Sequence, residues 1–308
     1  MSMTAGGAAR GAAGLPRRAL GRTGVAVPVI GIGCGVSWWE DAGSQENALA
    51  ALEGALDLGV TYIDTGQSYG KGLSEAWVGR VLAKRRAEVF LATKISVRDG
   101  DEALRETERG LRRLGTDRID LLHIHNLRGA GDLAAIEAKG GLLEAVYRLR
   151  DEKTARFIGI TSHTDPGVLK TALERHDFDC TQMALNAALQ GFAEDRPSRP
   201  APSFEALALP AARRKNMGVI AMKVTGRKTL LGSGPGRAGA PELLRYVLSL
   251  PVSVAVVGMS KMEQIRANAA LARDFRPMTP VEMKEVSGRI SSASKAALDA
   301  WFAKHEDA

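Results

Sequence analysis

Cysteine is scarce in this sequence of 308 residues, which contains only Cys34 and Cys180. The two residues stand far apart and show none of the spacings of metal-ligating or disulfide-forming motifs. A disulfide scaffold, an iron–sulfur cluster and a zinc site are therefore not expected, and no metal is predicted. A chain with so few thiols suits a reducing compartment, so we expect a cytoplasmic protein.

Long apolar runs are also missing. No stretch approaches the roughly 20 apolar residues that cross a membrane as a helix. The pair Arg17-Arg18 resembles a twin-arginine export signal, but Gly, Arg and Pro interrupt the residues that follow it. Aromatic residues make up only 5% of the chain, and the net charge of +7 is not gathered into a basic stripe with interleaved aromatics. We therefore expect neither a membrane nor a nucleic-acid partner.

The remaining composition, 45% hydrophobic and 25% charged, is that of a globular protein with a sizeable core. Residues 1–15 are rich in Ala and Gly and are predicted to form a disordered tail. The length of the rest, residues 16–308, suits either one large α/β barrel or two ordinary domains. The order of its predicted elements decides for a single domain.

Short apolar segments alternate with amphipathic helical stretches along this domain. The predicted strands cover residues 29–33, 60–64, 89–94, 119–125, 156–161, 180–185, 218–222 and 252–257. Eight strand–helix repeats predict a (β/α)8 TIM barrel of the α/β class. An N-terminal β-hairpin over residues 18–28 is expected to cap the bottom of this barrel. One or two extra C-terminal helices are expected over residues 280–308.

Several residues mark predicted helix starts. Ser44 and Ser74 are expected to cap the helices after the first and second strands, and Pro166 is expected to begin another. Ser260, with Glu263 three residues later, is expected to cap the helix after the eighth strand.

Two segments break the regular alternation and are predicted as enlarged loops. They are residues 127–141 after the fourth strand and residues 190–209 after the sixth. Both follow the carboxyl ends of strands, where the active sites of barrels lie. We favour a role for them in shaping a pocket over simple surface insertions.

The first strand carries glycines that only partly match a dinucleotide fingerprint. Gly31, Gly33 and Gly35 lack the third glycine of the G-x-G-x-x-G spacing, and the next helix begins only near Ser44. A Rossmann fold is therefore disfavoured. The intervening Trp38-Trp39 pair either forms the wall of a substrate pocket or anchors the loop in the core.

Three consecutive predicted strand ends carry polar side chains that suit one site. Asp64 ends the second strand and is followed five residues later by Tyr69, while Lys94 and His125 end the third and fourth strands. Because parallel strands end on the same rim of a barrel, these side chains should converge. His123 lies two residues before His125 and should share its face, so it is a rival for the same role.

These residues and their flanks resemble the aldo-keto reductase family. The similar motifs are DTxxxYG, SEAWVGRVL, ATK and DLLxIH, together with an RxLGRTG opening, and the resemblance runs from about Arg18 to about Asn268. It implies the family's Asp-Tyr-Lys-His tetrad at Asp64, Tyr69, Lys94 and His125. It also implies an NAD(P)-dependent oxidoreductase that interconverts an aldehyde or ketone and its alcohol.

The chemistry explains why these four residue types would occur together. Reducing a carbonyl with a hydride leaves an alkoxide, which needs a proton and stabilisation. A lysine cation favours the phenolate of a neighbouring tyrosine, so Lys94 would make Tyr69 a better general acid and base. Asp64 would hold Lys94, and His125 would donate a hydrogen bond to the substrate oxygen. The alternative is a structural tyrosine beside a structural Asp–Lys ion pair.

The resemblance also implies where NADP or NAD would bind. The family holds the nicotinamide carboxamide with a Ser-Asn pair, which here reads Thr161-Ser162, and with a glutamine, which here is Gln182. The family's stacking tyrosine is replaced by Met222-Lys223, and Lys223 is expected to contact the cofactor.

At the adenosine end, the implied contacts are Gly258, Ser260, Lys261, Gln264 and Asn268. Many family members carry Lys-Ser and an arginine at the places of Gly258, Met259 and Gln264, where they read the 2′-phosphate of NADP. Their absence predicts relaxed cofactor specificity. The glycine-rich residues 232–239 either fold over the pyrophosphate or form a loose connector.

Two other classes of function compete with the reductase. One is a regulatory subunit that keeps the barrel and the cofactor but acts by docking to a partner. The other is a barrel lyase or isomerase in which Lys94 forms a Schiff base. The expected partners are a small-molecule carbonyl or alcohol substrate, and the protein is expected to be a monomer or a small homo-oligomer.

Overall fold

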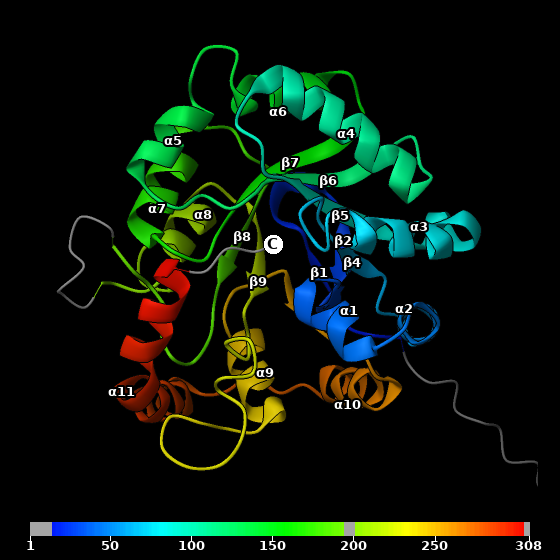
Figure 1. Cartoon of the computed structure of the whole chain (residues 1–308). Coiled ribbons are helices and arrows are strands. Elements are labelled where there is room, and N and C mark those ends of the chain that lie inside the picture. Colours follow the sequence, from blue (N-terminus) through cyan, green and yellow to red (C-terminus); the bar gives the residue numbers. More distant parts are fainter. Residues whose placement is uncertain (1–13, 194–200, 305–308) are drawn as a thin grey trace, which may run out of the picture.

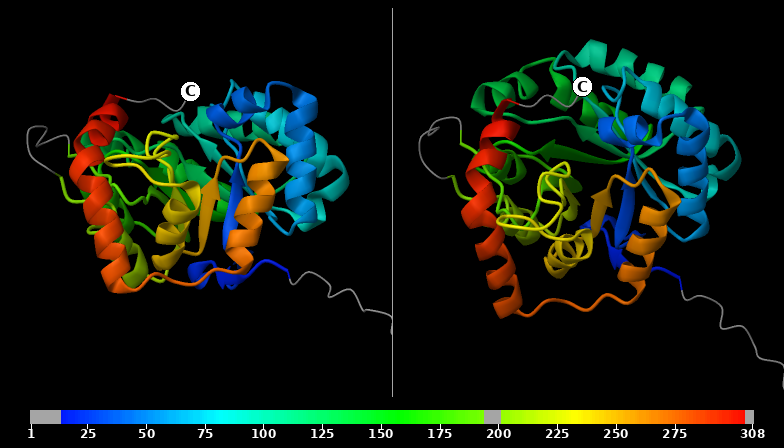
Figure 2. Two further views of the ribbon diagram at one scale, coloured as in Figure 1. Left: turned by 90° about the horizontal axis from the view of Figure 1, so that it is seen from below. Right: turned by 60° about the horizontal axis from the view of Figure 1, so that its bottom comes forward.

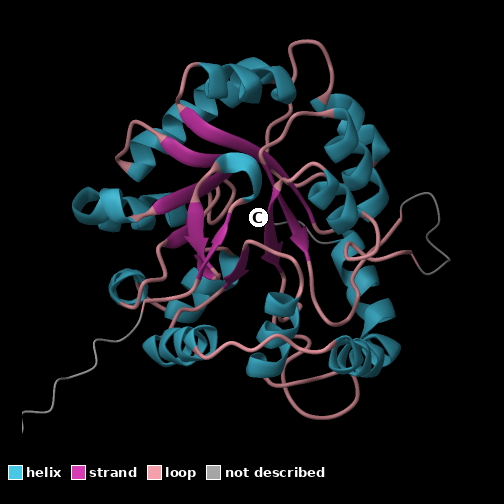
Figure 3. Ribbon diagram, turned by 180° about the vertical axis from the view of Figure 1, so that it is seen from behind, coloured by secondary structure: helices cyan, strands magenta, loops and turns pink. Residues whose placement is uncertain are grey.

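The computed structural model describes residues 14–193 and 201–304. Eight parallel strands form a closed barrel in the order β10-β3-β4-β5-β6-β7-β8-β9, and the pairing of Val256 with Gly31 closes the ring (Figures 1 and 3). The strands are β3 (Ile30–Gly33), β4 (Tyr62–Asp64), β5 (Phe90–Ile95), β6 (Ile119–Ile124), β7 (Ala155–Ser162), β8 (Cys180–Ala184), β9 (Gly218–Met222) and β10 (Val254–Val257). The predicted (β/α)8 barrel is confirmed.

Helices surround the barrel on its outside (Figure 1). They are α1 (Val36–Ala42), α2 (Gln45–Asp57), α3 (Leu73–Arg85), α4 (Gly100–Leu114), α5 (Ala130–Ile136), α6 (Leu142–Asp151), α7 (Pro166–Arg175), α8 (Ala208–Arg214), α9 (Ala240–Ser249), α10 (Met262–Arg273) and α11 (Pro280–Lys304). The C-terminal segment forms the single helix α11 within the described residues. None of the helices in that part of the chain has the length and apolar character needed to cross a bilayer.

Alternation along the strands separates two apolar cores. The larger core fills the space between the strands and the helices. The smaller core lies inside the barrel and is formed by Leu20, Val27, Tyr62, Phe90, Ala92, Leu121, Cys180, Ile220, Val254 and Val256. In this inner core, the rings of Tyr62 and Phe90 stack with centroids 5.2 Å apart. Two-residue alternation then places Asp64, Lys94 and His123 on the same inner face, nearer the carboxyl ends of the strands.

The N-terminal hairpin closes one end of the barrel, as predicted. Strands β1 (Arg17–Ala19) and β2 (Ala26–Pro28) pair antiparallel around the 3-10 turn η1 (Gly21–Thr23), and they lie at the end away from the last turns of α11 (Figure 2). Leu20 and Val27 are fully buried against the inner core.

The packed part of the chain begins slightly earlier than expected. Leu15, which falls within the predicted tail of residues 1–15, is only 7% exposed and packs in the outer core. Residues 1–13 lie outside the described residues.

Of the four predicted helix starts, those at Ser44 and Pro166 are correct and those at Ser74 and Ser260 are wrong. The Ser44 hydroxyl accepts a hydrogen bond from the Asn47 N–H at 3.2 Å, and Pro166 begins α7. Helix α3, however, begins at Leu73, before Ser74. The Ser74 hydroxyl instead donates to the Cys34 carbonyl at 2.7 Å, because burial brings these sequence-distant residues together.

The two predicted loops have more structure than expected. Residues 127–141 contain helix α5. In the segment 190–209, residues 194–200 lie outside the described part, while Phe204 is fully buried. The Lys295 ammonium of α11 donates to the carbonyls of Leu189 and Gly191, at 2.7 and 3.2 Å, and so fixes the start of this segment.

The contact between α3 and α4 yields a test of the packing. Gly79→Ala would place a Cβ 2.4 Å from the Arg113 carbonyl oxygen, whereas the Cβ of Gly288→Ala in α11 would meet nothing within 4 Å. Gly79→Ala should lower the free energy of unfolding by about 1–3 kcal/mol through overpacking. Gly288→Ala should raise it by roughly 0.5–1 kcal/mol, because alanine favours a helix. Denaturant unfolding of both variants checks this, and equal effects would contradict the packing.

Candidate active site

A buried ion pair forms the centre of the site. Asp64 ends β4 and Lys94 lies near the end of the neighbouring β5, so their side chains meet inside the same rim of the barrel. The Lys94 Nζ atom is 2.5 Å from Asp64 Oδ1 and donates to the Thr65 carbonyl at 2.7 Å. The two charged side chains are only 1% and 5% exposed. Such a pair is stable only with good geometry and further hydrogen bonds, of which the Thr65 carbonyl supplies one to Lys94.

Tyr69 and His125 complete the predicted tetrad around this pair. The Lys94 Nζ atom lies 4.8 Å from the centroid of the Tyr69 ring. The rings of Tyr69 and His125 are perpendicular, with centroids 5.7 Å apart. His125 directly follows β6, and Tyr69 lies in the turn after β4. The structure therefore brings all four residues together.

The electrostatics follow from burial. Burial raises the pKa of the Asp64 carboxyl, and the charge of Lys94 acts in the opposite direction. The thiol of Cys34, next to the pair, has a pKa raised well above its usual value by burial and by the charge of Asp64. Cys34 is therefore a neutral thiol at physiological pH, and it adds no negative charge that would compete for Lys94.

His123, the rival of His125, is fully enclosed in the barrel interior. Burial lowers its pKa well below the usual value, and the Lys94 charge adds to this effect. Within the described part of the chain, neither of its ring nitrogens has a hydrogen-bond partner. A Cβ on Gly159 would lie 2.6 Å from its Nδ1, so glycine leaves room for this ring. Of the two histidines, His125 is the one in contact with Tyr69.

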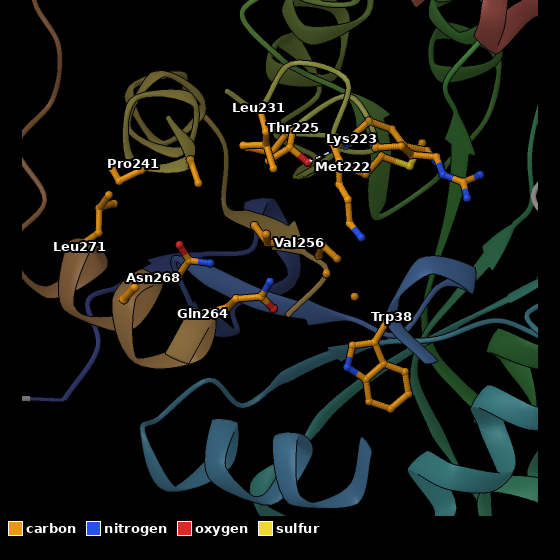
Figure 4. Close-up of a pocket in the computed structure, with 18 of the residues that line it drawn as sticks. Trp38, Met222, Lys223, Thr225, Leu231, Pro241, Val256, Gln264, Asn268 and Leu271 are labelled. Carbon is orange, nitrogen blue, oxygen red and sulfur yellow. Dashed lines mark hydrogen bonds between the residues drawn. The ribbon is translucent and has the colours of Figure 1, made fainter. Parts of the chain in front are cut away.

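A long cleft of about 970 Å³ leads from Asp64 and Tyr69 to helix α10. Figure 4 shows Trp38 and Lys223 near one end and Pro241 and Leu271 near the other, with Gln264 and Asn268 of α10 between them. Six of the nine predicted cofactor contacts line it: Gln182, Lys223, Gly258, Lys261, Gln264 and Asn268. A cleft of this size suits an extended dinucleotide.

Two buried polar atoms near the tetrad have no hydrogen-bond partner among the described residues. They are Gln182 Oε1 and Thr161 Oγ1, and their residues are 1% and 0% exposed. The two residues are register partners in the β7–β8 pair and so lie on the same face. Unpartnered buried polar groups are rare in proteins, and an amide-bearing ligand such as a nicotinamide would satisfy these two.

Ser162 differs from these two residues because its hydroxyl already has hydrogen-bond partners. It is fully buried, and its hydroxyl donates to the Leu127 carbonyl at 2.7 Å and accepts from the Thr164 N–H at 3.3 Å. It follows Thr161 in an extended strand and therefore faces the opposite side. The Ser162 hydroxyl thus already has protein partners, and its contact with the cofactor stays a prediction.

Lys223 projects into the cleft from the end of β9 (Figure 4). Its backbone is left-handed, with φ of 58°, and its carbonyl accepts a hydrogen bond from Asn186 Nδ2 at 3.2 Å. The charge of Lys223 is close enough to lower the pKa of Asp64. A cation thus occupies the region where the family resemblance implied a stacking aromatic ring.

Trp38 lies in helix α1 and not in the predicted loop. Its side chain is 1% exposed, and its indole N–H donates to the Met259 carbonyl at 3.2 Å, so it ties α1 to the segment before α10. It also lines the cleft (Figure 4). Trp39 is partly buried beside the outer core.

At the far end, Gln264 caps its own helix. Its Oε1 accepts hydrogen bonds from the backbone N–H groups of Ser260 and Lys261, at 3.1 and 3.3 Å. Helix α10 begins at Met262 with Lys261 as its cap residue, so the prediction of Ser260 as the cap is wrong. Ser260 is buried and is not among the cleft-lining residues.

The loop after β9 forms one wall of the cleft. Leu231 and Ala240 line it, and Gly236 is held against α11 by the Ser294 hydroxyl, which donates to the Gly236 carbonyl at 2.9 Å. A Cβ on Gly236 would lie only 2.0 Å from that hydroxyl. Within the glycine-rich residues 232–239, Gly236 and Ala238 are therefore buried anchor points, while the other residues of the segment are exposed.

Several cleft residues were missed at the level of sequence. Lys228 and Asp41 form an ion pair at 2.6 Å between the loop after β9 and helix α1, while Arg245 and Arg276 line the far end. These residues come from segments that are distant along the chain. No local pattern in the sequence could have linked them to a common site.

Comparisons with known proteins agree with this geometry. The model of the aldo/keto reductase family matches residues 29–236, which is more than half of the chain. The oxidoreductase YqkF of Bacillus subtilis is 28% identical over 87% of this chain and 94% of its own length. The D-threo-aldose 1-dehydrogenase of a Pseudomonas species is 32% identical over 71% of this chain and 72% of its own length.

Solved structures share the fold. An aldo-keto reductase of Klebsiella pneumoniae in complex with NADPH superposes with a TM-score of 0.69 at 24% identity, over 90% of this chain and 95% of that one. The family match, the relatives and the closed barrel all support the same family assignment. This chain belongs to the aldo-keto reductase family and is an oxidoreductase.

Proposed function

We propose that this protein is an NAD(P)-dependent oxidoreductase that interconverts an aldehyde or ketone and its alcohol, with Tyr69 as the general acid and base. The observation that carries this proposal is the contact of Tyr69 with both Lys94 and His125 at the inner end of the cleft. The substrate is expected to be a small molecule whose oxygen lies between Tyr69 and His125.

Tyr69 would move the proton. In the reductive direction its hydroxyl donates to the oxygen on which charge develops, and in the oxidative direction its phenolate takes a proton from the alcohol. The Lys94 ammonium next to the ring favours the phenolate, and Asp64 holds that ammonium in place. His125 would donate a hydrogen bond to the same oxygen and orient the substrate.

The cofactor would lie along the cleft. When bound, its nicotinamide supplies or accepts the hydride. Gln182 and Thr161, whose polar atoms lack partners among the described residues, would hold the carboxamide. Gly258, Lys261 and Asn268 line the other end and would contact the adenosine part. The loop after β9, tied to α1 by the Lys228–Asp41 ion pair, would cover the pyrophosphate.

Many family members read the 2′-phosphate of NADP with charged residues that this chain lacks at Gly258, Met259 and Gln264, and the cations that remain near the α10 end of the cleft are Lys261, Arg245 and Arg276. Gln264 stands where many family members carry an arginine. Its side chain already accepts hydrogen bonds from two backbone N–H groups at the helix start. Those N–H groups are the ones that a helix start offers to an anion. We therefore propose that both NADP and NAD serve this enzyme.

The geometry argues against the Schiff-base alternative. A Schiff base needs a neutral, accessible amine, whereas the Lys94 ammonium is enclosed and bound by Asp64 and the Thr65 carbonyl. The regulatory alternative predicts cofactor binding without turnover. Absorbance of the reduced nicotinamide with a panel of aldehydes and ketones tests the proposal, and cofactor binding without any turnover across the panel would favour the regulatory role.

Tyr69→Phe should remove the proton donor and leave cofactor binding nearly intact. We expect a fall in kcat of about 10²–10⁴, the usual contribution of general acid–base catalysis. Lys94→Met should be at least as damaging, because Asp64 then also loses its partner. Steady-state kinetics with cofactor titration checks both variants. Wild-type turnover by Tyr69→Phe would refute the assigned role.

His125→Ala should raise KM for the carbonyl more than it lowers kcat, since its main contribution is to substrate positioning. His123→Asn is the matched variant, because His123 lies two residues earlier, within β6, and is fully buried. We expect it to alter KM by less than about threefold, a change of under 1 kcal/mol. Loss of substrate affinity in His123→Asn alone would reverse the assignment.

Cofactor choice gives a further test. Titrating NADPH and NADH by protein fluorescence, to which Trp38 in the cleft contributes, should reveal weak discrimination at one fixed salt concentration. Gln264→Arg should raise the NADPH preference by at least about tenfold, because a charged hydrogen bond contributes roughly 1.5–3 kcal/mol. Gln264→Met removes the cap without adding charge and is the control. A wild-type preference for NADPH of about a thousandfold, about 4 kcal/mol, would contradict the proposal.

A further inference from the structure

We infer that Ser96 and Arg98 are positioning residues that fix the imidazole of His125 in one tautomer, with its hydrogen on Nε2. The inference rests on the proposed function for the substrate-binding role of His125. Both residues belong to the short loop between β5 and α4. Ile95 and Ile124 are partners in the β5–β6 ladder, so the next residues along, Ser96 and His125, emerge side by side.

Ser96 contacts the ring directly. Its Oγ lies 3.2 Å from His125 Nδ1. Its backbone N–H donates to Gln67 Oε1 at 3.2 Å, which fixes the main chain at this point. Within the described residues, Nδ1 of His125 is the one partner of the Ser96 hydroxyl. A hydroxyl rotates to donate to an available acceptor, so the Ser96 O–H donates and Nδ1 accepts.

This direction decides what the ring offers to the substrate. A neutral imidazole has one donor nitrogen and one acceptor nitrogen. With Nδ1 as the acceptor, the hydrogen lies on Nε2, which can then donate to the substrate oxygen. The opposite tautomer would present a lone pair to an oxygen on which negative charge develops, and it would give no stabilisation. In that arrangement the Ser96 hydroxyl hydrogen would also have no acceptor among the residues that the structure describes.

Arg98 holds the main chain on both sides of this contact. Its Nη1 donates to the carbonyls of Ser96 and His125, at 3.0 and 2.6 Å, and its Nη2 donates to the Asn126 carbonyl at 3.3 Å. One guanidinium thus bridges the ends of two neighbouring strands. A planar, rigid fork restricts their relative movement, which a flexible lysine would not do.

Asp132 of α5 fixes the guanidinium in turn. It accepts from Arg98 Nε and Nη2 at 2.7 and 2.8 Å, a two-point pairing, and also accepts from the Arg128 N–H at 3.1 Å. The Arg98 and Asp132 side chains are 24% and 20% exposed. Through Asp132 and Arg98, the enlarged segment 127–141 therefore stabilises the backbone at His125.

The test is the tautomer of His125 in the resting enzyme. ¹⁵N-histidine labelling and two-bond proton–nitrogen spectra distinguish Nδ1 from Nε2 protonation, and His125→Asn identifies the signal among the five histidines. We expect the wild type and Ser96→Thr, which keeps the hydroxyl, to carry the hydrogen on Nε2. Ser96→Ala should give a mixture of tautomers. An unchanged His125 spectrum in Ser96→Ala would overturn the inference.

Kinetics provides a second readout. Ser96→Ala should lower kcat/KM for the carbonyl about five- to tenfold, the usual effect of losing one hydrogen bond, with the cofactor Kd unchanged. Arg98→Lys should lower it in the same direction, with Asp132 still paired. Wild-type kcat/KM in both variants would overturn the inference.

This experiment separates the inference from the proposed function. The tautomer is read without substrate, so it judges Ser96 even if Tyr69→Phe keeps full activity. An inactive Tyr69→Phe combined with an unaltered Ser96→Ala tautomer would refute only the positioning role. Folding of each variant is checked by comparing the remaining histidine signals with those of the wild type.

Discussion

The buried ion pair between Lys94 and Asp64 is the interaction on which the rest of the site depends. Removing two charges from water is costly, and only a rigid pairing with further hydrogen bonds offsets that cost. The closed barrel supplies the rigidity, because β4 and β5 pair with each other and each also pairs with another strand of the barrel. With Lys94 held by Asp64 and the Thr65 carbonyl, its charge lies at a fixed distance from the Tyr69 ring.

The same reliance on neighbouring strand ends recurs on the other side of Tyr69. The ends of β5 and β6 bring Ser96 to His125, and Arg98 ties the two strands together through backbone carbonyls. Further out, the walls of the cleft are joined by side chains from distant segments, such as the Lys228–Asp41 ion pair. At the start of α10, the side-chain amide of Gln264 accepts the backbone hydrogen bond that a bound anion could otherwise accept. Rigid contacts therefore surround the tetrad, while at the far end of the cleft a neutral amide, Gln264, stands where the family resemblance implied an arginine.

Much of the barrel and the whole tetrad could be predicted because they follow from local rules. Apolar segments of strand length, separated by amphipathic helices, specify eight repeats, and strand ends on one rim bring Asp64, Lys94 and His125 together. The period of two also separates Thr161 from Ser162, but applying it required the register between β7 and β8. Without that register, both residues looked equally able to hold a carboxamide. The prediction that Ser260 caps a helix was wrong because the side chain of Gln264 accepts the hydrogen bonds of the backbone N–H groups there.

The sequence by itself determined the fold class, the family resemblance and the four residues of the tetrad, since each depends on residue type and short-range spacing. Only the tertiary structure decided that Trp38 lies in helix α1, bonds the Met259 carbonyl and lines the cleft, and that Gly236 is held against α11. It also revealed that Ser96 meets His125. The physical reason is that such contacts join side chains across the barrel rim. Their existence depends on the register and packing of elements far apart in the chain, which no local pattern specifies.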